Sequence, residues 1–237
     1  MKFTVCIPMY NESKIIADTA RKLSDYMSAN FEEYEIIFSD DGSKDGSADI
    51  VRELALPGVR VVGYADNRGK GSAVREAMLA SSGDAVMFTD SDLAYGTDVI
   101  KKVAEAFENN PDCDVVVGSR NLDKEGYSSY TLLRKIASKC YIGVLKAVGG
   151  LKISDSQCGC KAFSGRAAKR IFSHCQVNRF AFDFEAILIA EKCGYKIHEI
   201  PVKIINHGDS KVNVLRDSVK MIRDIAKMKK RISKLDV

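Results

Sequence analysis

Short runs of β-branched residues alternate with helical segments through the first half of the chain, and this alternation restricts the fold more than any other feature. The strand-like runs are Lys2–Ile7, Glu35–Ser39, Val59–Gly63, Ala85–Thr89 and Val115–Gly118. The helical segments between them are Ser13–Ala29, Asp45–Leu54, Lys70–Ala80 and Asp98–Asn109. This order predicts a doubly wound α/β sheet, in which ligands bind beyond the carboxyl ends of the strands.

Beyond Arg120 the alternation stops. The sequence there predicts a helix over Tyr130–Val148, a loop with a short strand over Ser154–Ser164, a helix over Phe182–Lys192, a strand over Ile197–Ile205 and a last helix over Val212–Lys234. No internal repeat, low-complexity segment or Pro/Gly-rich linker divides the chain. We therefore expect a single domain over residues 1–211, followed by a basic amphipathic C-terminal helix over residues 212–237.

Composition narrows the class of protein. The 237 residues are 46% hydrophobic and 29% charged, as in ordinary globular domains. No window approaches the roughly 18 apolar residues of a membrane-spanning helix, and the N-terminus lacks the apolar stretch of a signal peptide. The seven cysteines are an odd number without zinc-ligand spacing, which is typical of reduced thiols. We therefore expect a cytoplasmic location.

Positive charge is concentrated at the C-terminus. Residues 211–237 hold nine Lys or Arg against three Asp, although the net charge of the whole chain is only +4. In the same segment Leu215, Val219, Ile222 and Ile225 recur at helical spacing. Two interpretations stay open: peripheral contact of this helix with the cytoplasmic face of an anionic membrane, or packing on its own domain with a solvated basic face.

Each of the first four predicted strands is followed by a polar cluster. In chain order the clusters are Pro8-Met9-Tyr10-Asn11-Glu12, Asp40-Asp41-Gly42-Ser43, Asn67-Arg68-Gly69-Lys70-Gly71 and Asp90-Ser91-Asp92. The third is a cationic loop that opens a helix, which is a natural contact for an anion. The fourth places two carboxylates on one turn, and Mg²⁺ commonly uses one or two carboxylates together with substrate phosphates.

Taken singly, each cluster has an ordinary explanation. Asp-Asp-Gly-Ser is a common helix cap, Gly-Lys-Gly can merely begin a helix, and Asp-x-Asp arises by chance. The spacing of a phosphate-binding P-loop is absent, as is the Gly-x-Gly-x-x-Gly of dinucleotide dehydrogenases. The conjunction of two acidic loops and one basic loop, in this order along one sheet edge, predicts a site for a nucleotide and a metal ion.

The clusters also support a resemblance to a known family. Together with Gly118-Ser119-Arg120, their order resembles the inverting glycosyltransferases of family 2, which have the GT-A fold, a Rossmann-like mixed sheet flanked by helices. The resemblance continues through Asp155-Ser156-Gln157-Cys158-Gly159-Cys160-Lys161, Phe182-Asp183-Phe184-Glu185 and Ser210-Lys211. It is similar there to the branch that makes dolichyl- or polyprenyl-phosphate glucose or mannose, especially the dolichyl-phosphate β-glucosyltransferases.

This resemblance implies roles on the donor side. Pro8, Tyr10, Glu12 and Asp41 are expected to line the pocket for the base and ribose, with Asp40 alongside and Lys70 near the nucleotide. Asp92 is expected to bind Mg²⁺ or Mn²⁺ and to be essential for catalysis, while Asp90 contacts the ribose or the metal ion. Ser91, between these two carboxylates, is included among the donor-binding residues. The donor is expected to be a UDP- or GDP-linked hexose.

It implies roles on the acceptor side as well. A lipid phosphate requires fixed cations, for which the candidates are Arg120, Arg134, Lys161 and Lys211, with Ser210 beside them. Relatives have a proposed base at the position of Asp155, which we expect either to take that role or to orient Lys161 or the sugar. A phosphate nucleophile is largely ionised at neutral pH and requires little help from a base. Attack opposite the leaving diphosphate would give a β-linked product.

Other functions are less well supported by the sequence. A family 2 transferase that acts on a saccharide hydroxyl is the main alternative. A sugar-phosphate nucleotidyltransferase would have a glycine-rich basic loop after the first strand, and a non-catalytic sugar-nucleotide binder would not require both Asp90 and Asp92. No recognition motif for nucleic acid accompanies the basic C-terminus. A homo-oligomer is compatible with the sequence, which does not decide the point.

Overall fold

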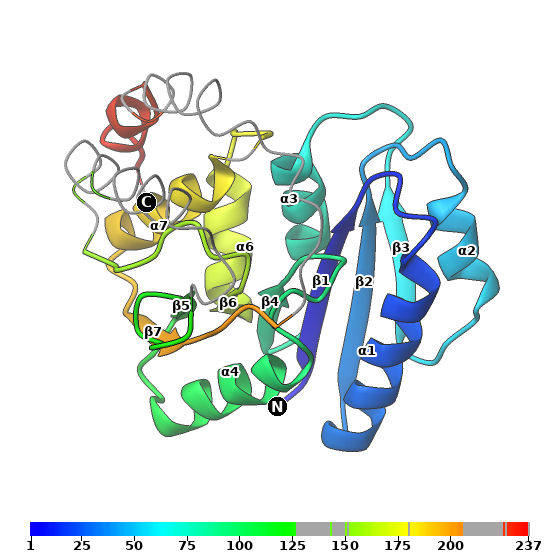
Figure 1. The fold of residues 1–237 in the computed structure, drawn as a ribbon. Coiled ribbons are helices and arrows are strands. Elements are labelled where there is room, and N and C mark those ends of the chain that lie inside the picture. The colour runs from blue at the N-terminus through cyan, green and yellow to red at the C-terminus, as the bar shows by residue number, and fades with distance from the viewer. Residues whose placement is uncertain are drawn as a thin grey trace.

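The computed structural model describes residues 1–126, 143, 150, 152–179, 181–205, 225 and 227–236. Its centre is a seven-stranded sheet formed by β1 (Phe3–Met9), β2 (Tyr34–Asp40), β3 (Val59–Gly63), β4 (Ala85–Phe88), β5 (Val115–Ser119), β6 (Lys161–Ser164) and β7 (Ile197–Pro201) (Figure 1). The strands lie in the order β3-β2-β1-β4-β6-β5-β7. β6 is antiparallel to β4 and β5, whereas the other neighbouring strands pair in parallel. The predicted mixed α/β sheet is confirmed.

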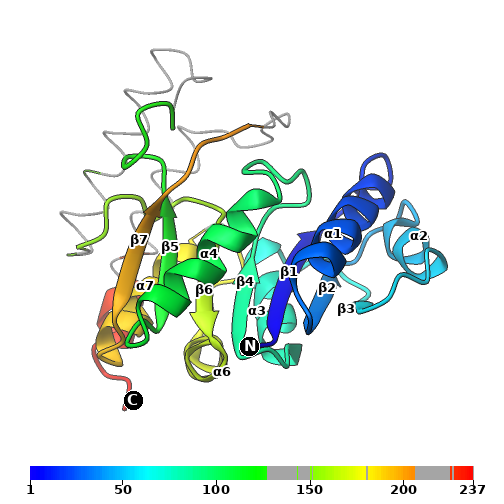
Figure 2. The same ribbon diagram turned by 90° about the horizontal axis from the view of Figure 1, so that it is seen from below.

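Helices cover both faces of the sheet (Figure 2). The helices are α1 (Ile16–Asn30), α2 (Ser47–Glu53), α3 (Lys70–Ala80), α4 (Asp98–Asn109), α6 (Gly165–His174) and α7 (Phe182–Lys192). Apolar side chains of α1, α2 and α4 form one buried cluster with the strands, and those of α3, α6 and α7 form a second. Because each face has its own helical layer, the sheet is doubly wound.

Side-chain patterns explain these layers. Helix α4 buries Val99, Ile100, Val103, Ala104 and Ala106, which share one face at helical spacing. Helix α7 is buried on all sides from Phe182 to Ala190, because the sheet and its neighbouring helices enclose it. A helix enclosed in this way holds its acidic residues in a fixed, largely dry environment, which matters for the site described below.

Helix α6 was not predicted from the sequence. Its side chains Ala167, Ala168, Ile171 and Phe172 follow helical spacing and are buried. The hydroxyl of Ser164 accepts a hydrogen bond from the backbone N–H of Ala167 and caps the helix. The sequence analysis ends the preceding loop and strand at Ser164 and predicts no element over residues 165–174. The predicted last strand is also shorter than expected, because β7 ends at Pro201.

The described part of the C-terminal segment is helical at residues 225 and 227–232. Ile225, Met228 and Ile232 are buried in the cluster beneath α6 and α7, whereas Lys227 and Lys230 are exposed. This part of the segment therefore packs on its own domain. The predicted helix over residues 130–148 and the first half of the C-terminal helix lie largely outside the described residues. Within the part of the chain that is described, no helix has both the length and the hydropathy of a membrane span.

Candidate active site

The carboxyl ends of β1, β2, β3 and β4 meet at one edge of the sheet (Figure 1). The strand register pairs Met9 with Asp40 and Asp40 with Gly63, so the loops after these strands begin at the same level. The backbone N–H of Asn11 donates to the hydroxyl of Ser43 at 2.9 Å, which ties the first loop to the second. The polar clusters expected to meet at this edge are therefore brought together.

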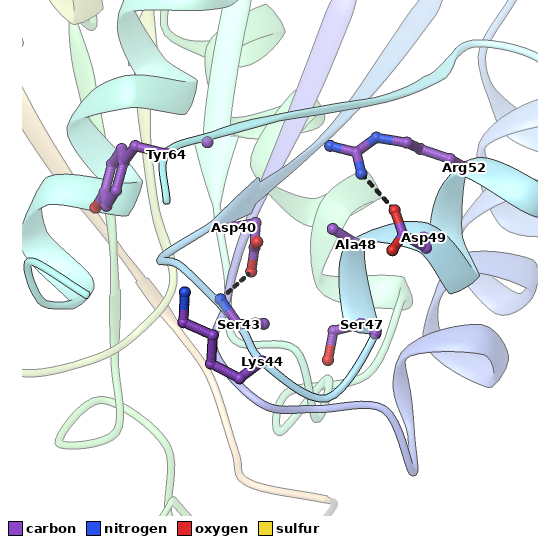
Figure 3. Close-up of a pocket in the computed structure, with 10 residues that line it drawn as sticks. Asp40, Ser43, Lys44, Ser47, Ala48, Asp49, Arg52 and Tyr64 are labelled. Carbon is purple, nitrogen blue, oxygen red and sulfur yellow. Dashed lines mark hydrogen bonds and ion pairs between the residues drawn. The ribbon is translucent and has the colours of Figure 1, made fainter. Parts of the chain in front are cut away.

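A cavity of about 380 Å³ opens between the loop after β2, helix α2 and the end of β3 (Figure 3). Asp40 lines it and accepts a hydrogen bond from the backbone N–H of Ser43 at 3.1 Å. Lys44 connects the loops after β2 and β3, because its ammonium donates to the carbonyl of Ala65 at 3.0 Å. Tyr64, immediately after β3, also lines the cavity. The cavity thus combines an anionic and a cationic side chain, whereas the ring of Tyr64 points away from them (Figure 3).

The residues predicted after β1 lie at the same edge but do not line this cavity. Pro8 is buried within β1, whereas Tyr10 is 42% exposed on the loop that follows. Glu12 is half-buried, and its backbone N–H donates to the hydroxyl of Ser47 at 2.9 Å. An exposed aromatic ring at the carboxyl edge is available to a planar ligand, so Tyr10 stays the prediction for contact with the base.

Asp41 faces inward and organises the loop between β3 and α3. Its carboxylate is buried and accepts hydrogen bonds from the hydroxyl of Tyr64 at 2.7 Å and the amide of Asn67 at 2.8 Å. It also accepts from the backbone N–H groups of Arg68 and Gly69, each at 2.9 Å. Burial, followed by the hydrogen bond to Asp41, raises the pKa of Tyr64 well above its ordinary value. In this geometry Asp41 holds the loop between β3 and α3 in place, while its neighbour Asp40 faces the cavity.

The Asp90-Ser91-Asp92 turn lies beside Lys70, at the start of α3. The ammonium of Lys70 forms an ion pair with Asp90. Burial would lower the pKa of Lys70, but the negative charges of Asp90 and Asp183 raise it. The carboxylate of Asp92 accepts from the N–H of Ala94 at 3.0 Å, and its pKa is raised by burial and then by the charge of Asp90.

The turn is held firmly from two sides. The carbonyl of Ser91 accepts a hydrogen bond from the hydroxyl of Thr19 on α1 at 2.7 Å. Gly159 packs against Asp90 so closely that an added Cβ atom would lie 2.4 Å from Asp90 Oδ2. The N–H of Gly159 in turn donates to the buried hydroxyl of Tyr95 at 3.3 Å.

These residues fit the expected divalent cation. Asp90 and Asp92 provide carboxylate oxygens on one turn, and both are only partly exposed. Mg²⁺ and Mn²⁺ prefer such hard oxygen ligands and complete their coordination with water and substrate phosphates. Lys70 stands where it can meet the same phosphates, because it already faces the carboxylate of Asp90.

The start of α3 corrects one part of the prediction. We expected this glycine-rich helix N-terminus to contact an anion, but the N–H of Gly69 donates to Asp41 and the N–H groups of Gly71 and Ser72 donate to the carbonyl of Asn178. These backbone donors are engaged within the protein. The contact with an anion is therefore left to the side chains of the loop, above all Lys70.

Arg120 and Asp155 form a buried pair near the end of β5. The guanidinium donates to both oxygens of Asp155, from Nε at 2.7 Å and from the terminal nitrogen at 2.9 Å. Burial would raise the pKa of Asp155, but the hydrogen bonds and charge of Arg120 hold it below its ordinary value. A carboxylate held in this way is a weak base, so the geometry favours a positioning role for Asp155, which orients Arg120.

Lys161 lies at the start of β6 and is fully buried. Its ammonium donates to the carbonyl of Cys158 at 2.6 Å and to the carboxylate of Asp183 at 3.1 Å. Lys161 and Arg120 thus each have a carboxylate partner within the protein. The other residues predicted to bind the acceptor phosphate, Arg134, Ser210 and Lys211, lie outside the described residues.

Sequence reasoning missed several residues that shape the site. The sequence analysis does not single out Tyr64, Tyr95 or Asn178, and it includes Asp183 only in the motif Phe182-Asp183-Phe184-Glu185. Tyr64 could have been found from its place immediately after β3, between the two predicted loops. Asn178 contributes its backbone carbonyl, which no residue type reveals.

Comparison with known proteins agrees with this geometry. The family model described as "Glycosyl transferase family 2" matches residues 4–172. A dolichyl-phosphate β-glucosyltransferase of Trichomonas vaginalis is 34% identical over 223 residues, covering 89% of this chain and 66% of that protein. One from Dictyostelium discoideum is 30% identical and covers 92% and 71%. The chain thus spans about two thirds of the length of these relatives.

Solved structures show the same fold at low sequence identity. Glucosyl-3-phosphoglycerate synthase from Mycobacterium tuberculosis in complex with UDP superposes with a TM-score of 0.68 at 19% identity, covering 99% of this chain and 81% of that one. The same enzyme with Mn²⁺, UDP and phosphoglyceric acid gives a TM-score of 0.67 at 18% identity, with 100% and 80% coverage. The chain has the GT-A fold and belongs to glycosyl transferase family 2.

Proposed function

We propose that this chain transfers glucose from UDP-glucose to the phosphate of a dolichyl or polyprenyl lipid, with inversion at the anomeric carbon. The observation that carries the proposal is the carboxyl edge of the sheet, where Lys70 forms an ion pair with Asp90 of the Asp90-Ser91-Asp92 turn. The cavity lined by Asp40 opens at the same edge. The names of the relatives from Trichomonas vaginalis and Dictyostelium discoideum support the choice of glucose and of a dolichyl phosphate.

The donor diphosphate would lie between Lys70 and the Asp90-Ser91-Asp92 turn. When bound there, Mg²⁺ or Mn²⁺ supplies a Lewis acid that neutralises the leaving diphosphate. Lys70 contributes a fixed positive charge next to the same leaving group, and this charge is maintained at neutral pH because Asp90 and Asp183 raise its pKa. The protein thus holds charge where negative charge develops during the reaction.

The acceptor phosphate would act as its own nucleophile. Its second pKa is about 6, so most of it is ionised at neutral pH without a general base. This agrees with the state of Asp155, whose two oxygens both accept from Arg120. Arg120 is then oriented by Asp155 and supplies positive charge on the acceptor side. An in-line attack opposite the diphosphate converts an α-linked donor into a β-linked lipid.

Peripheral contact with the membrane would bring the enzyme to its lipid. The exposed Lys227 and Lys230 lie on the C-terminal helix, whose Ile225, Met228 and Ile232 face the protein core. Each exposed cation near an anionic leaflet contributes about 1 kcal/mol of binding free energy. Sedimentation with vesicles that contain anionic lipid measures this contact, which the variant Lys227→Glu/Lys230→Glu is expected to weaken.

A transfer screen tests the proposal. The purified chain is incubated with UDP- and GDP-hexoses and Mn²⁺ or Mg²⁺, with dolichyl phosphate, undecaprenyl phosphate or free sugars as acceptors. We expect a β-linked glucosyl lipid from UDP-glucose, and we expect Asp92→Asn to reduce its formation by at least about 100-fold because a metal-bound charge is lost. Transfer to a sugar hydroxyl but never to a lipid phosphate would reject the proposal in favour of the saccharide-directed alternative.

A further inference from the structure

The segment between α6 and α7 packs directly on the start of α3. The carbonyl of Asn178 accepts hydrogen bonds from the N–H groups of Gly71 at 2.9 Å and Ser72 at 3.3 Å. An added Cβ atom would lie 2.4 Å from the carbonyl of Asn178 if placed on Gly69, and 2.4 Å from that of Val177 if placed on Gly71. The two glycines on either side of Lys70 are thus required for this close contact.

The same segment, residues 175–179, is fastened from α3 and from α7. Arg75 of α3 donates to the carbonyl of Cys175 and to the side-chain oxygen of Asn178, each at 3.1 Å. Glu185 of α7 accepts from the N–H groups of Gln176 at 2.9 Å and Val177 at 2.8 Å with a single carboxylate oxygen. The position of the segment therefore depends on the carboxylate of Glu185.

The C-terminal helix fixes that carboxylate. Arg231 donates to the other oxygen of Glu185, and also to the carbonyl of His174 at 3.1 Å. Glu185 is fully buried, whereas the Arg231 side chain is 26% exposed. In Figure 1 the C-terminal segment, drawn in red, lies beside α7. Met228 and Ile232, on either side of Arg231 in sequence, are buried in the core beneath α7 and fix the helix there.

We propose that Arg231 is a positioning residue for the donor site. By holding Glu185, it fixes residues 175–179 against Gly69 and Gly71, and this contact sets the position from which Lys70 meets Asp90. Donor affinity then depends on the packing of the C-terminal helix against α7, although Arg231 is distant in sequence from every predicted donor-binding residue. The inference rests on the proposed function, because it is measured through binding of the donor nucleotide.

The test compares Arg231→Met with wild type, using calorimetric titration of UDP in the presence of Mn²⁺. Substitutions along such a packed connection alter coupling by about 0.5–2 kcal/mol, so we expect a roughly 2- to 30-fold higher Kd for UDP. The donor KM is expected to rise, whereas the KM for the lipid phosphate stays unchanged. Arg231→Lys is expected to recover part of the affinity, because an ammonium can reach Glu185 but lacks the fork that also meets His174.

Lys234→Met is the matched control, because it removes a nearby, exposed cation from the same C-terminal segment. It is expected to bind UDP like wild type. Thermal melting shows which variants are folded at the assay temperature. A folded Arg231→Met that binds UDP with the wild-type Kd would overturn the inference and leave Arg231 a purely structural role.

Gly71→Ala displaces the same contact from its other side and leaves Arg231 intact. Because its Cβ would meet the carbonyl of Val177, we expect the same loss of UDP affinity. A folded Gly71→Ala with wild-type affinity would also contradict the inference. Failure of the wild-type protein to bind UDP at all would instead reject the proposed function, so the two failures are distinguishable.

Discussion

Asp40 and Asp41 are adjacent carboxylates that the structure gives opposite tasks, and the substitution Asp41→Asn tests this difference. The carboxylate of Asp41 accepts five hydrogen bonds from four residues, Tyr64, Asn67, Arg68 and Gly69, because the N–H of Gly69 is shared between both oxygens. A carboxamide has one acceptor oxygen and one NH₂ group. In Asp41→Asn the NH₂ group would therefore replace one carboxylate oxygen and face N–H or O–H donors with which it cannot form a hydrogen bond.

The magnitude follows from the number of bonds lost. At least two of the five hydrogen bonds disappear, since Oδ2 accepts two and Oδ1 accepts three, and a hydrogen bond to a charged group contributes about 1.5–3 kcal/mol. The expected loss is therefore at least about 3 kcal/mol in the free energy of unfolding. For a chain of this size, 1 kcal/mol shifts Tm by about 2–4 °C, so Tm should fall by roughly 6–12 °C.

The neighbouring substitution Asp40→Asn is the control. Asp40 is half-buried, and within the described part of the chain its carboxylate accepts one hydrogen bond, from the N–H of Ser43, which the oxygen of asparagine can keep. We expect its free energy of unfolding to change by less than about 1 kcal/mol. Urea denaturation followed by circular dichroism measures both variants. If Asp41→Asn were as stable as Asp40→Asn, the role of Asp41 as an anchor of the loop would be refuted.

Two further predictions concern the buried pair of Arg120 and Asp155. Arg120→Met leaves the fully buried Asp155 without its ionic partner, so urea denaturation should show a loss of about 3–5 kcal/mol, part of which Arg120→Met/Asp155→Asn should recover. The second concerns acid. Because the folded-state pKa of Asp155 is depressed, the pair stabilises the fold fully above the unfolded value near 3.9 and loses this contribution as pH falls through the folded value. The stability advantage of wild type over Asp155→Asn should therefore shrink below about pH 4 in denaturation curves recorded at stepped pH; an advantage that stays constant to pH 2 would contradict this.

The fold was largely predictable because its signals are local. Runs such as Ala85–Phe88 are short and apolar, and α3 and α4 begin and end where their periodicity does. The antiparallel placement of β6 between β4 and β5 depends on long-range pairing, which no local pattern encodes. Helix α6 was missed although its capping serine and apolar face were visible, because we assigned Ser164 only to the preceding strand.

The site was predictable in its composition but not in its connections. The sequence predicts Asp90, Asp92 and Lys70 at one edge of the sheet, and the structure brings Lys70 into contact with Asp90 there. The sequence could not separate Asp40 from Asp41, since adjacent carboxylates differ only in the direction that the backbone gives them. The sequence also predicted an anion contact for the loop that contains Gly69 and Gly71. In the structure, a Cβ atom added to either glycine would meet a backbone carbonyl oxygen, that of Asn178 for Gly69 and that of Val177 for Gly71.

The occupied amides at the start of α3 have a consequence for how the donor is bound. Since the N–H groups of Gly69, Gly71 and Ser72 donate within the protein, the proposed function gives the contact with the diphosphate to the side chain of Lys70 and to the cation proposed on Asp90 and Asp92. Without the donor, Lys70 forms an ion pair with Asp90 and would therefore compete with that cation. Binding of the diphosphate would draw Lys70 away from Asp90 and leave the carboxylate of Asp90 for the metal ion. The nucleotide and the metal ion would then each increase the affinity for the other.

The variant Lys70→Met should therefore change two affinities in opposite directions. Without nucleotide, Mn²⁺ should bind up to about five-fold more tightly, because an ion pair that is partly exposed contributes at most about 1 kcal/mol. With Mn²⁺ present, UDP should bind about 10- to 150-fold more weakly, since a charged hydrogen bond worth about 1.5–3 kcal/mol is lost. Calorimetric titration with Mn²⁺ alone, and then with UDP and Mn²⁺, measures both. Weaker binding in both titrations would show that Lys70 supports the cation site rather than competing for it, and the exchange of partners would have to be abandoned.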